Sequence, residues 1–311
     1  MIVNTGGRTD TAQYYADWLL GRFAEGYALS RNPLFPHKVG RIELKPSVVD
    51  CVVFCSKNYA PLLPRLHEIT DRFNTYFYYT ITAYGPDVEP GVPSIEESMD
   101  TLRRLAEQVG AHRVAWRYDP VLLTKTYTVE RHRETFATMA AALAPFVDRC
   151  IFSFVELYKK VESNMPELIP LDREVMEELA ASFGETARCH GLHLQICGTN
   201  EDWSRFGIHP SGCMTTEILG RANGVQFRDV KHAGMRHGCH CIESRDIGAY
   251  DTCPNGCKYC YANQSPKLAA ENFKRHDPAA PLLIGELGPD DTIVPAVQKS
   301  FLEADQLTLG F

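Results

Sequence analysis

Short runs of apolar and β-branched residues alternate with amphipathic segments over most of the chain. This alternation is typical of repeated βα units, in which buried parallel strands are joined by helices. The predicted strands cover residues 1–5, 50–56, 76–84, 113–119, 150–157, 192–199 and 281–287.

The segments between these runs carry apolar residues at helical spacing. One helical face is formed by Tyr15, Trp18, Leu19 and Phe23. A second helix opens with a capping box from Ser94 to Glu97, and two more are predicted over 128–146 and 173–191. The rhythm predicts an α/β fold of the (β/α)8 type, a TIM-like barrel, with an open doubly wound sheet as the alternative.

Polar residues follow several of the predicted strands. In a βα barrel the loops at the carboxyl ends of the strands build the active site, so these residues are expected to meet at one mouth. The candidate catalytic residues are Arg8, Asp10, Lys57, Arg117 and Asp119. Two have structural alternatives, because Asp10 is placed to cap a helix beginning at Thr11 and Asp119 precedes Pro120, as turn residues do.

The βα rhythm stops near residue 200, and residues 201–262 are rich in Gly, His and Cys without a good strand or a long helix. A structureless stretch of this length in a compact domain is normally either functional or a misreading of the pattern, and the cysteines in it favour function. We therefore divide the chain into a barrel core at 1–200, a Cys/His-rich iron-sulfur segment at 201–262, and a closing helix and strand of the same barrel at 263–311.

Composition and charge narrow the class of protein. The 311 residues are 44% hydrophobic and carry a net charge of -7, which argues against a broad nucleic-acid-binding surface. No run is long and apolar enough to span a bilayer, and no signal sequence is evident, so a cytoplasmic location is expected. In that reducing compartment the eleven cysteines are expected to bind metal or to catalyse rather than to form disulfides.

Three of these cysteines form the sequence Cys253-x3-Cys257-x2-Cys260. This spacing, with the aromatic Tyr259 before the last cysteine, is similar to the motif of the radical S-adenosylmethionine (SAM) enzymes, which bind a 4Fe-4S cluster with one iron open to SAM. The alternative is a structural zinc ion held by Cys257, Cys260 and two of Cys239, Cys241 and His240.

Four further cysteines are Cys197, Cys213, Cys239 and Cys241. Four thiolates would complete a second, fully ligated 4Fe-4S cluster. Alternatively, Cys241 would cap the fourth iron of the first cluster and convert it to an electron-transfer or structural centre. The remaining cysteines lie within predicted strands or a helix and are expected to be small core residues, namely Cys51, Cys55, Cys150 and Cys189.

Several short motifs resemble the bacterial domain-of-unknown-function family 1848. They are R-T-D at 8–10, R-N-P at 31–33, S-K-N at 56–58, W-R-Y-D-P at 116–120, and the cysteine motif with its flanks through residue 262. The resemblance runs from about residue 1 to 290 and implies a C-terminal cysteine cluster similar to that of radical SAM enzymes. It favours iron-sulfur over zinc and implies no particular substrate.

Radical SAM enzymes usually carry the cysteine motif after the first strand, whereas here it lies at 253–260. A permuted radical SAM barrel would reconcile the two. The strand predicted at 281–287 would then bring Gly285 and Glu286 to the SAM amino group, as part of the cofactor-binding set with Tyr259.

The expected function is that of a radical SAM-like iron-sulfur enzyme that cleaves SAM and abstracts hydrogen from an unknown polar substrate, either a small molecule or a modified macromolecule. Such an enzyme would need an electron donor such as flavodoxin or ferredoxin. The alternatives are a redox or binding protein whose clusters are fully ligated by the protein, and a structural-zinc protein.

Overall fold

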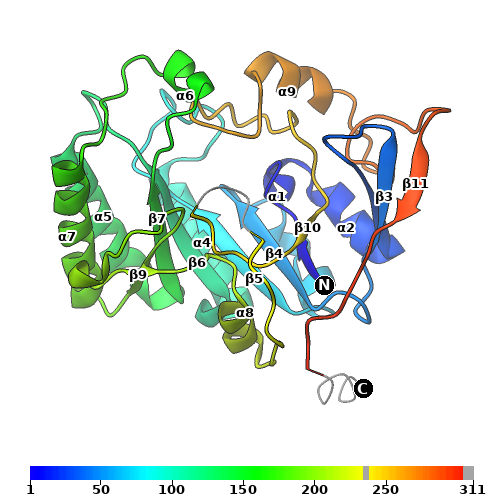
Figure 1. The fold of residues 1–311 in the computed structure, drawn as a ribbon, viewed down its shortest axis with the longest axis horizontal. Coiled ribbons are helices and arrows are strands. Elements are labelled where there is room, and N and C mark those ends of the chain that lie inside the picture. Colours follow the sequence, from blue (N-terminus) through cyan, green and yellow to red (C-terminus); the bar gives the residue numbers. More distant parts are fainter. Residues whose placement is uncertain (234–237, 304–311) are drawn as a thin grey trace.

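A parallel sheet of eight strands forms the centre of the computed structural model, which describes residues 1–233 and 238–303 (Figure 1). Every strand pairing in this sheet is parallel. In spatial order the strands are β10 (Arg245–Asp246), β1 (Ile2–Asn4), β4 (Cys51–Ser56), β5 (Thr75–Thr80), β6 (Val114–Val121), β7 (Arg149–Phe154), β8 (His193–Ile196) and β9 (His209–Pro210).

The predicted mixed α/β fold with a large parallel sheet is confirmed, whereas closure into a barrel is not shown. The edges of the sheet are β9 and β10, and no ladder joins these two edges within 1–233 and 238–303. Both edge strands are two residues long and lie in the segment for which the sequence predicted no good strand.

A second, three-stranded sheet was not predicted. It consists of β2 (Tyr27–Arg31), β3 (Lys38–Glu43) and β11 (Thr292–Pro295), with β3 in the middle. The strand predicted at 281–287 is not formed, and Leu282 makes only an isolated bridge with Leu29. Gly285 has a φ of 71°, which an extended strand does not accommodate. The closing strand of the predicted barrel is therefore wrong.

Helices connect the strands as the periodicity predicts. They are α1 (Thr11–Tyr14), α2 (Ala16–Glu25), α3 (His67–Thr70), α4 (Ile95–Val109), α5 (Val129–Leu143), α6 (Lys159–Asn164), α7 (Arg173–Cys189), α8 (Thr216–Asn223) and α9 (Pro266–Phe273). The capping box is present, because Ser94 Oγ accepts the Glu97 N–H at 3.2 Å and the Glu97 carboxylate accepts the Ser94 N–H at 3.0 Å. No helix among the described residues is long and apolar enough to cross a bilayer.

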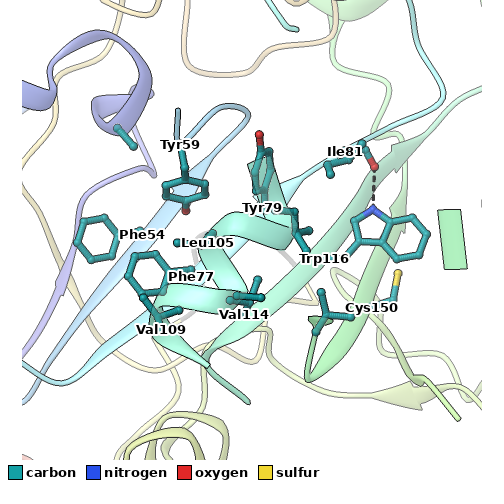
Figure 2. Close-up of a cluster of buried hydrophobic side chains, with 14 of the residues drawn as sticks. Phe54, Tyr59, Phe77, Tyr79, Ile81, Leu105, Val109, Val114, Trp116 and Cys150 are labelled. Atoms are coloured by element: carbon teal, nitrogen blue, oxygen red, sulfur yellow. Dashed lines mark hydrogen bonds between the residues drawn. The ribbon is translucent and has the colours of Figure 1, made fainter. Parts of the chain in front are cut away.

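The two faces of the sheet have separate cores because side chains alternate along each strand. One face packs on the connecting helices, and Figure 2 shows part of it, where the Phe54 and Phe77 rings stack at 4.7 Å. Trp116 stacks on Phe136 and donates its indole N–H to the carbonyl of Ile81 at 2.9 Å. Burying such large aromatic side chains stabilises the packing of the helices on the sheet.

The opposite face of the sheet is covered by α8 and by the cysteine-rich segment that follows it. The Asn223 carboxamide accepts the N–H of Thr75, the first residue of β5, at 3.0 Å, and Arg221 pairs with Asp148, just before β7, at 2.9 Å. These contacts place α8 at the amino ends of the strands. In Figure 1, α6 and α9 lie at the other end of the molecule.

The cysteines predicted as core residues divide into three groups. Cys51 and Cys150 are fully buried, as predicted. Cys189 is exposed at the end of α7, so its core assignment is wrong. Cys55 is half-buried near the carboxyl end of β4, and its thiol accepts a hydrogen bond from Arg117 at 3.3 Å. It therefore lies beside a candidate site residue.

Candidate functional site

Cys253, Cys257 and Cys260, which we call the cysteine triad, lie on the loop between β10 and α9 (Figure 1). Hydrogen bonds from several elements fix this loop. Tyr15 on α1–α2 donates its hydroxyl to the carbonyl of Thr252 at 2.6 Å, and the N–H of Lys258 donates to the carbonyl of Val88 at 3.0 Å. Lys160 on α6 donates to the carbonyls of Tyr261 and Asn263 at 3.1 and 2.6 Å.

A tight turn inside the loop separates the first two cysteines. Gly256 adopts a left-handed φ of 67°, which favours glycine, and its α-carbon faces Pro90. Asn255 fixes the turn, since its side-chain oxygen accepts the Tyr14 hydroxyl at 3.0 Å and its carbonyl accepts the N–H of Gly91 at 2.8 Å. The triad is thereby held against the loop that follows β5.

Backbone N–H groups point at the sulfur atoms of the triad. Cys260 accepts from the N–H of Ala262 at 3.3 Å, and the backbone groups of Asn255 and Asp10 stabilise the thiolate form of Cys253. Burial raises the pKa of Cys253 to about 12 and also raises that of Cys257. Such thiols stay protonated at neutral pH until a metal cation replaces the proton, and the N–H donors then stabilise the thiolate.

Asp10 joins β1, β4 and the cysteine loop. It caps α1 through the N–H of Gln13 at 3.1 Å, and it accepts from the Ser56 hydroxyl at 2.6 Å and the Lys57 N–H at 2.9 Å. The Asn255 carboxamide approaches its second oxygen at 3.4 Å. Burial raises the pKa of this carboxyl, and the donors oppose that rise. The capping alternative is confirmed, and the geometry gives Asp10 a positioning contact with the triad loop.

Lys57, Glu89 and Tyr259 form a buried polar group beside Cys257. One carboxylate oxygen of Glu89 accepts from Lys57 Nζ at 2.9 Å, from Thr82 Oγ1 at 2.8 Å and from the Tyr259 hydroxyl. Although burial opposes the charge, Glu89 and Cys257 raise the pKa of Lys57. The lysine therefore carries its positive charge at neutral pH next to the triad. Tyr259 supports this pair, and its predicted contact with a cofactor stays a prediction.

Arg117 and Asp119 project from the same face of β6 and form an ion pair. Asp119 also accepts the Ser153 hydroxyl, and Arg117 donates to Cys55 Sγ at 3.3 Å. Asp119 is part of β6, so the turn reading of Asp119-Pro120 is wrong. Arg117 is attracted electrostatically to Asp119, Cys55, Cys213 and Cys197, which places it between β4 and the second group of cysteines.

Arg8 lies at the edge of this region rather than at its centre. Its guanidinium donates to Ser30 Oγ at 3.3 Å and to the carbonyl of Gly248 at 3.4 Å, and it lies over the ring of Tyr250 at 5.5 Å. Asp246 on β10 attracts Arg8 and accepts the N–H groups of Gly7 and Gly248 at 2.9 and 2.7 Å. Each predicted cation therefore has an acidic neighbour.

The four remaining predicted ligands come together in one group, which we call the four-thiol cluster: Cys197, Cys213, Cys239 and Cys241. Cys213 and Cys241 have their sulfur atoms 3.3 Å apart. Cys197 lies beside Cys213, and Cys239 lies beside Cys241. The ligands predicted for one site from distant parts of the sequence are thus neighbours in the fold.

Gly285 and Glu286 are placed elsewhere. Glu286 is exposed, and its backbone carbonyl accepts a hydrogen bond from Arg31 of the small sheet at 2.8 Å. The strand on which their predicted SAM contact was based is not formed. The structure therefore gives no support to these two residues as SAM ligands.

Cys241 and His240, on which the zinc alternative and the capped cluster depend, have neighbours of their own. Cys241 lies against Cys213 and Cys239, and His240 donates from Nε2 to the Asn200 side-chain oxygen at 2.9 Å. Within residues 1–233 and 238–303, no three His, Cys, Asp or Glu side chains converge as a ready metal site. The triad nevertheless fits a cluster in its donor set, because soft thiols, N–H donors and an ammonium group surround one loop.

Four polar residues of this region were not predicted as site residues from the sequence: Cys55, Glu89, Ser153 and Asp246. Cys55 and Ser153 share the strand phase of Cys51 and Ile151, which pack on the cysteine-rich face, so strand alternation is the signal that would have found them. Glu89 follows β5 in an irregular loop, where no periodic pattern marks it.

A parallel α/β sheet with a cysteine-rich segment folded over one face and over the carboxyl ends of its strands defines the class of this protein. The chain belongs to the family described as Domain of unknown function (DUF1848), whose profile matches residues 2–262. The predicted family is confirmed, whereas this match does not test the likeness to the radical SAM cysteine motif.

Comparisons with individual proteins add little. No curated protein matches the chain. Among solved structures, the chain is similar to a crystal structure described as "a putative alpha-L-fucosidase" from Bacteroides thetaiotaomicron, with 10% identity and a TM-score of 0.29. The match covers 69% of this chain and 60% of that one. A likeness of this strength carries no argument about fold or activity.

Proposed function

We propose that this protein is an iron-sulfur enzyme of the radical SAM type, with a 4Fe-4S cluster on Cys253, Cys257 and Cys260. The observation that carries the proposal is the arrangement of these three thiols on one pinned loop. A bound, reduced cluster of this type supplies an electron that breaks the sulfonium C–S bond of SAM to give methionine and a 5′-deoxyadenosyl fragment, which takes a hydrogen atom from the substrate.

The residues around the triad support an anionic thiolate site. Lys57 lies beside Cys257 and contributes positive charge, while the N–H of Ala262 donates to sulfur and the backbone groups of Asp10 and Asn255 stabilise the Cys253 thiolate. Hydrogen bonds and positive charge near the sulfur atoms make a cluster easier to reduce. Asp10 and Glu89 fix the two loops that carry these donors, so the chain's part is to orient the site.

The competing function is a redox or binding protein in which every iron is held by the protein. That alternative requires Cys241 as the fourth ligand of the triad cluster. Because Cys241 lies against Cys213 and Cys239, the geometry favours a triad without this fourth cysteine. A vacant iron is what SAM binding needs, so we retain the enzyme proposal.

The chemical test uses anaerobically reconstituted protein with dithionite and SAM. We expect release of 5′-deoxyadenosine and methionine in equal amounts, with hydrogen for the product drawn from solvent, buffer or the protein when substrate is absent. Omitting dithionite serves as the control, because the C–S bond does not break without the electron. Intact SAM over a fully loaded, reduced cluster would overturn the proposal.

A further inference from the structure

The sulfur spacing in the four-thiol cluster favours a single metal ion over a second cubane. In a 4Fe-4S cluster each cysteine binds a different iron, so the cysteine sulfurs are held farther apart than around a single ion. A single tetrahedral ion with metal–sulfur bonds of about 2.3 Å holds them about 3.8 Å apart. The Cys213 and Cys241 sulfurs are 3.3 Å apart, and Cys197 and Cys239 lie beside them. The distance between the Cys213 and Cys241 sulfurs is therefore closer to that of a mononuclear site.

We propose that Cys197, Cys213, Cys239 and Cys241 bind one zinc ion in a closed, structural site. This inference replaces the second 4Fe-4S cluster predicted from the sequence and does not depend on the function proposed for the triad. Four thiolates without a vacant position are typical of structural zinc. These four ligands, at 197, 213, 239 and 241, are not arranged in the paired knuckles that mark many zinc sites in a sequence.

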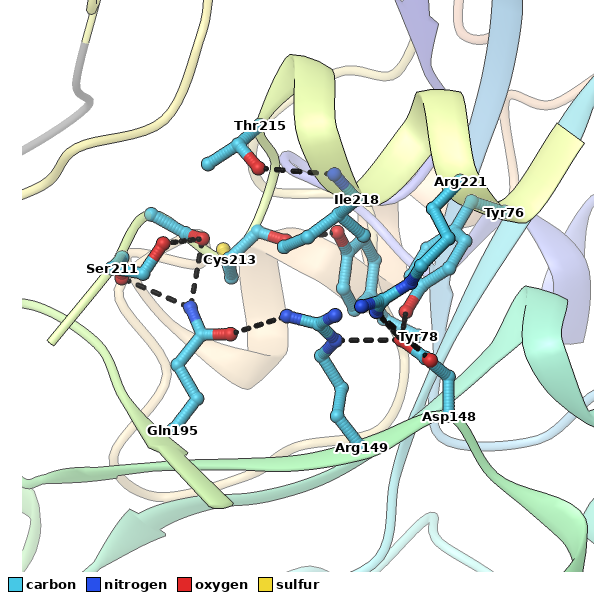
Figure 3. Close-up of polar contacts among 11 residues, drawn as sticks. Tyr76, Tyr78, Asp148, Arg149, Gln195, Ser211, Cys213, Thr215, Ile218 and Arg221 are labelled. Carbon is cyan, nitrogen blue, oxygen red and sulfur yellow. Dashed lines mark hydrogen bonds and ion pairs between the residues drawn. The ribbon is translucent and has the colours of Figure 1, made fainter. Parts of the chain in front are cut away.

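Side chains from the sheet hold the backbone that carries Cys213 (Figure 3). The buried Gln195 carboxamide donates to the carbonyls of Ser211 and Gly212 at 3.0 and 2.7 Å, and the Tyr78 hydroxyl donates to the carbonyl of Cys213. Arg149 in turn donates to the Gln195 side-chain oxygen at 3.1 Å. Three consecutive carbonyls are thus fixed toward the sheet.

The second ligand-bearing segment packs directly against the first. A β-carbon on Gly212 would lie 2.3 Å from the carbonyl oxygen of His240, so only glycine permits this approach of the two backbones. The segments are also bonded to each other, because the Ile242 N–H donates to the carbonyl of Met214 at 2.9 Å. Cys213 and Cys241 are therefore brought together by the fold itself rather than by flexible side chains.

Charge around the cluster suits a dianionic zinc tetrathiolate. The Met214 N–H donates to Cys241 Sγ at 3.4 Å, and Arg117 is attracted to Cys197 and Cys213. Its Nε is buried without a hydrogen-bond partner. The sulfurs of Cys213 and Cys241 need to separate by about 0.5 Å to reach the tetrahedral edge.

The test is zinc analysis and zinc-edge X-ray absorption on wild-type protein purified anaerobically without chelators. We expect about one zinc per chain with four sulfur neighbours at about 2.3 Å. Because this measurement is made on the wild-type protein, its result does not depend on whether a ligand variant folds. Absence of zinc, or zinc surrounded by nitrogen and oxygen, would overturn the proposal.

Two matched serine variants separate this site from the triad. Cys213→Ser should lose the zinc and keep the triad iron, whereas Cys257→Ser should keep the zinc whatever happens to the iron. If the Cys213→Ser variant contained less iron and sulfide than the wild type, the four cysteines would hold a second cubane, and the zinc assignment would be refuted. A zinc-loaded protein without any iron would refute only the function proposed for the triad.

Discussion

Cys257→Ser should abolish iron binding at the triad and with it any reductive cleavage of SAM. Serine is a hard ligand that keeps its proton at neutral pH, so it does not replace a thiolate on iron. Changes to groups that merely support metal ligands already cost roughly 10- to 100-fold in affinity. Losing one of three ligands should cost more. Iron and acid-labile sulfide per chain, measured after anaerobic reconstitution, check this prediction.

Cys189→Ser is the matched control for that variant. Cys189 is exposed at the end of α7, outside the triad and the four-thiol cluster, so its replacement should leave iron, sulfide and SAM cleavage unchanged. Circular dichroism of both variants shows whether the fold is kept. A folded Cys257→Ser protein with a full complement of iron would place the cluster on other residues and contradict the triad assignment.

Lys57→Met should destabilise the protein by about 3–5 kcal/mol, as the loss of one partner from a buried ion pair does. Glu89 is only 2% exposed and would be left without its cation partner. The raised pKa of Lys57 means that its contribution is present at all pH values below its ordinary pKa and is lost only as the pH rises through the higher folded-state value. Urea unfolding at pH 7 therefore measures the full effect.

Two further variants isolate the cause of this loss. The double variant Lys57→Met with Glu89→Gln removes the stranded charge while keeping a hydrogen-bonding side chain near Thr82 and Tyr259, so it should recover most of the stability. Lys267→Met breaks an exposed pair on α9 with a separation of 4.0 Å and should change stability by less than about 0.5 kcal/mol. Equal losses in Lys57→Met and the double variant would contradict the account.

The main sheet was predictable because its strands are long, buried and separated by periodic helices. The runs at 50–56 and 150–157 correspond to β4 and β7 within a few residues. The apolar run at 281–287 was wrongly predicted to be a strand. Gly285 takes a left-handed conformation there, and the segment packs beside β2. The edge strands β9 and β10 have two residues each, too few for any periodicity to show.

The positions of candidate site residues that directly follow a strand could be predicted from the sequence. The side chains that they contact could not, because those contacts depend on the tertiary structure. Lys57 and Arg117 were found because the carboxyl ends of parallel strands share one edge of the sheet. Their partners were harder to find, since Glu89 reaches Lys57 from an irregular loop. Cys55 was assigned to the core because its strand is apolar, although its position near the end of β4 puts the thiol beside Arg117.

The central claim is a three-thiol iron-sulfur cluster with one iron open to SAM. Electron paramagnetic resonance of the dithionite-reduced wild-type protein, recorded with and without SAM, tests it most directly. We predict a reduced-cluster signal that changes on addition of SAM, because the cofactor binds the open iron. A signal identical in both samples, or no iron-sulfur signal from fully reconstituted protein, would contradict it.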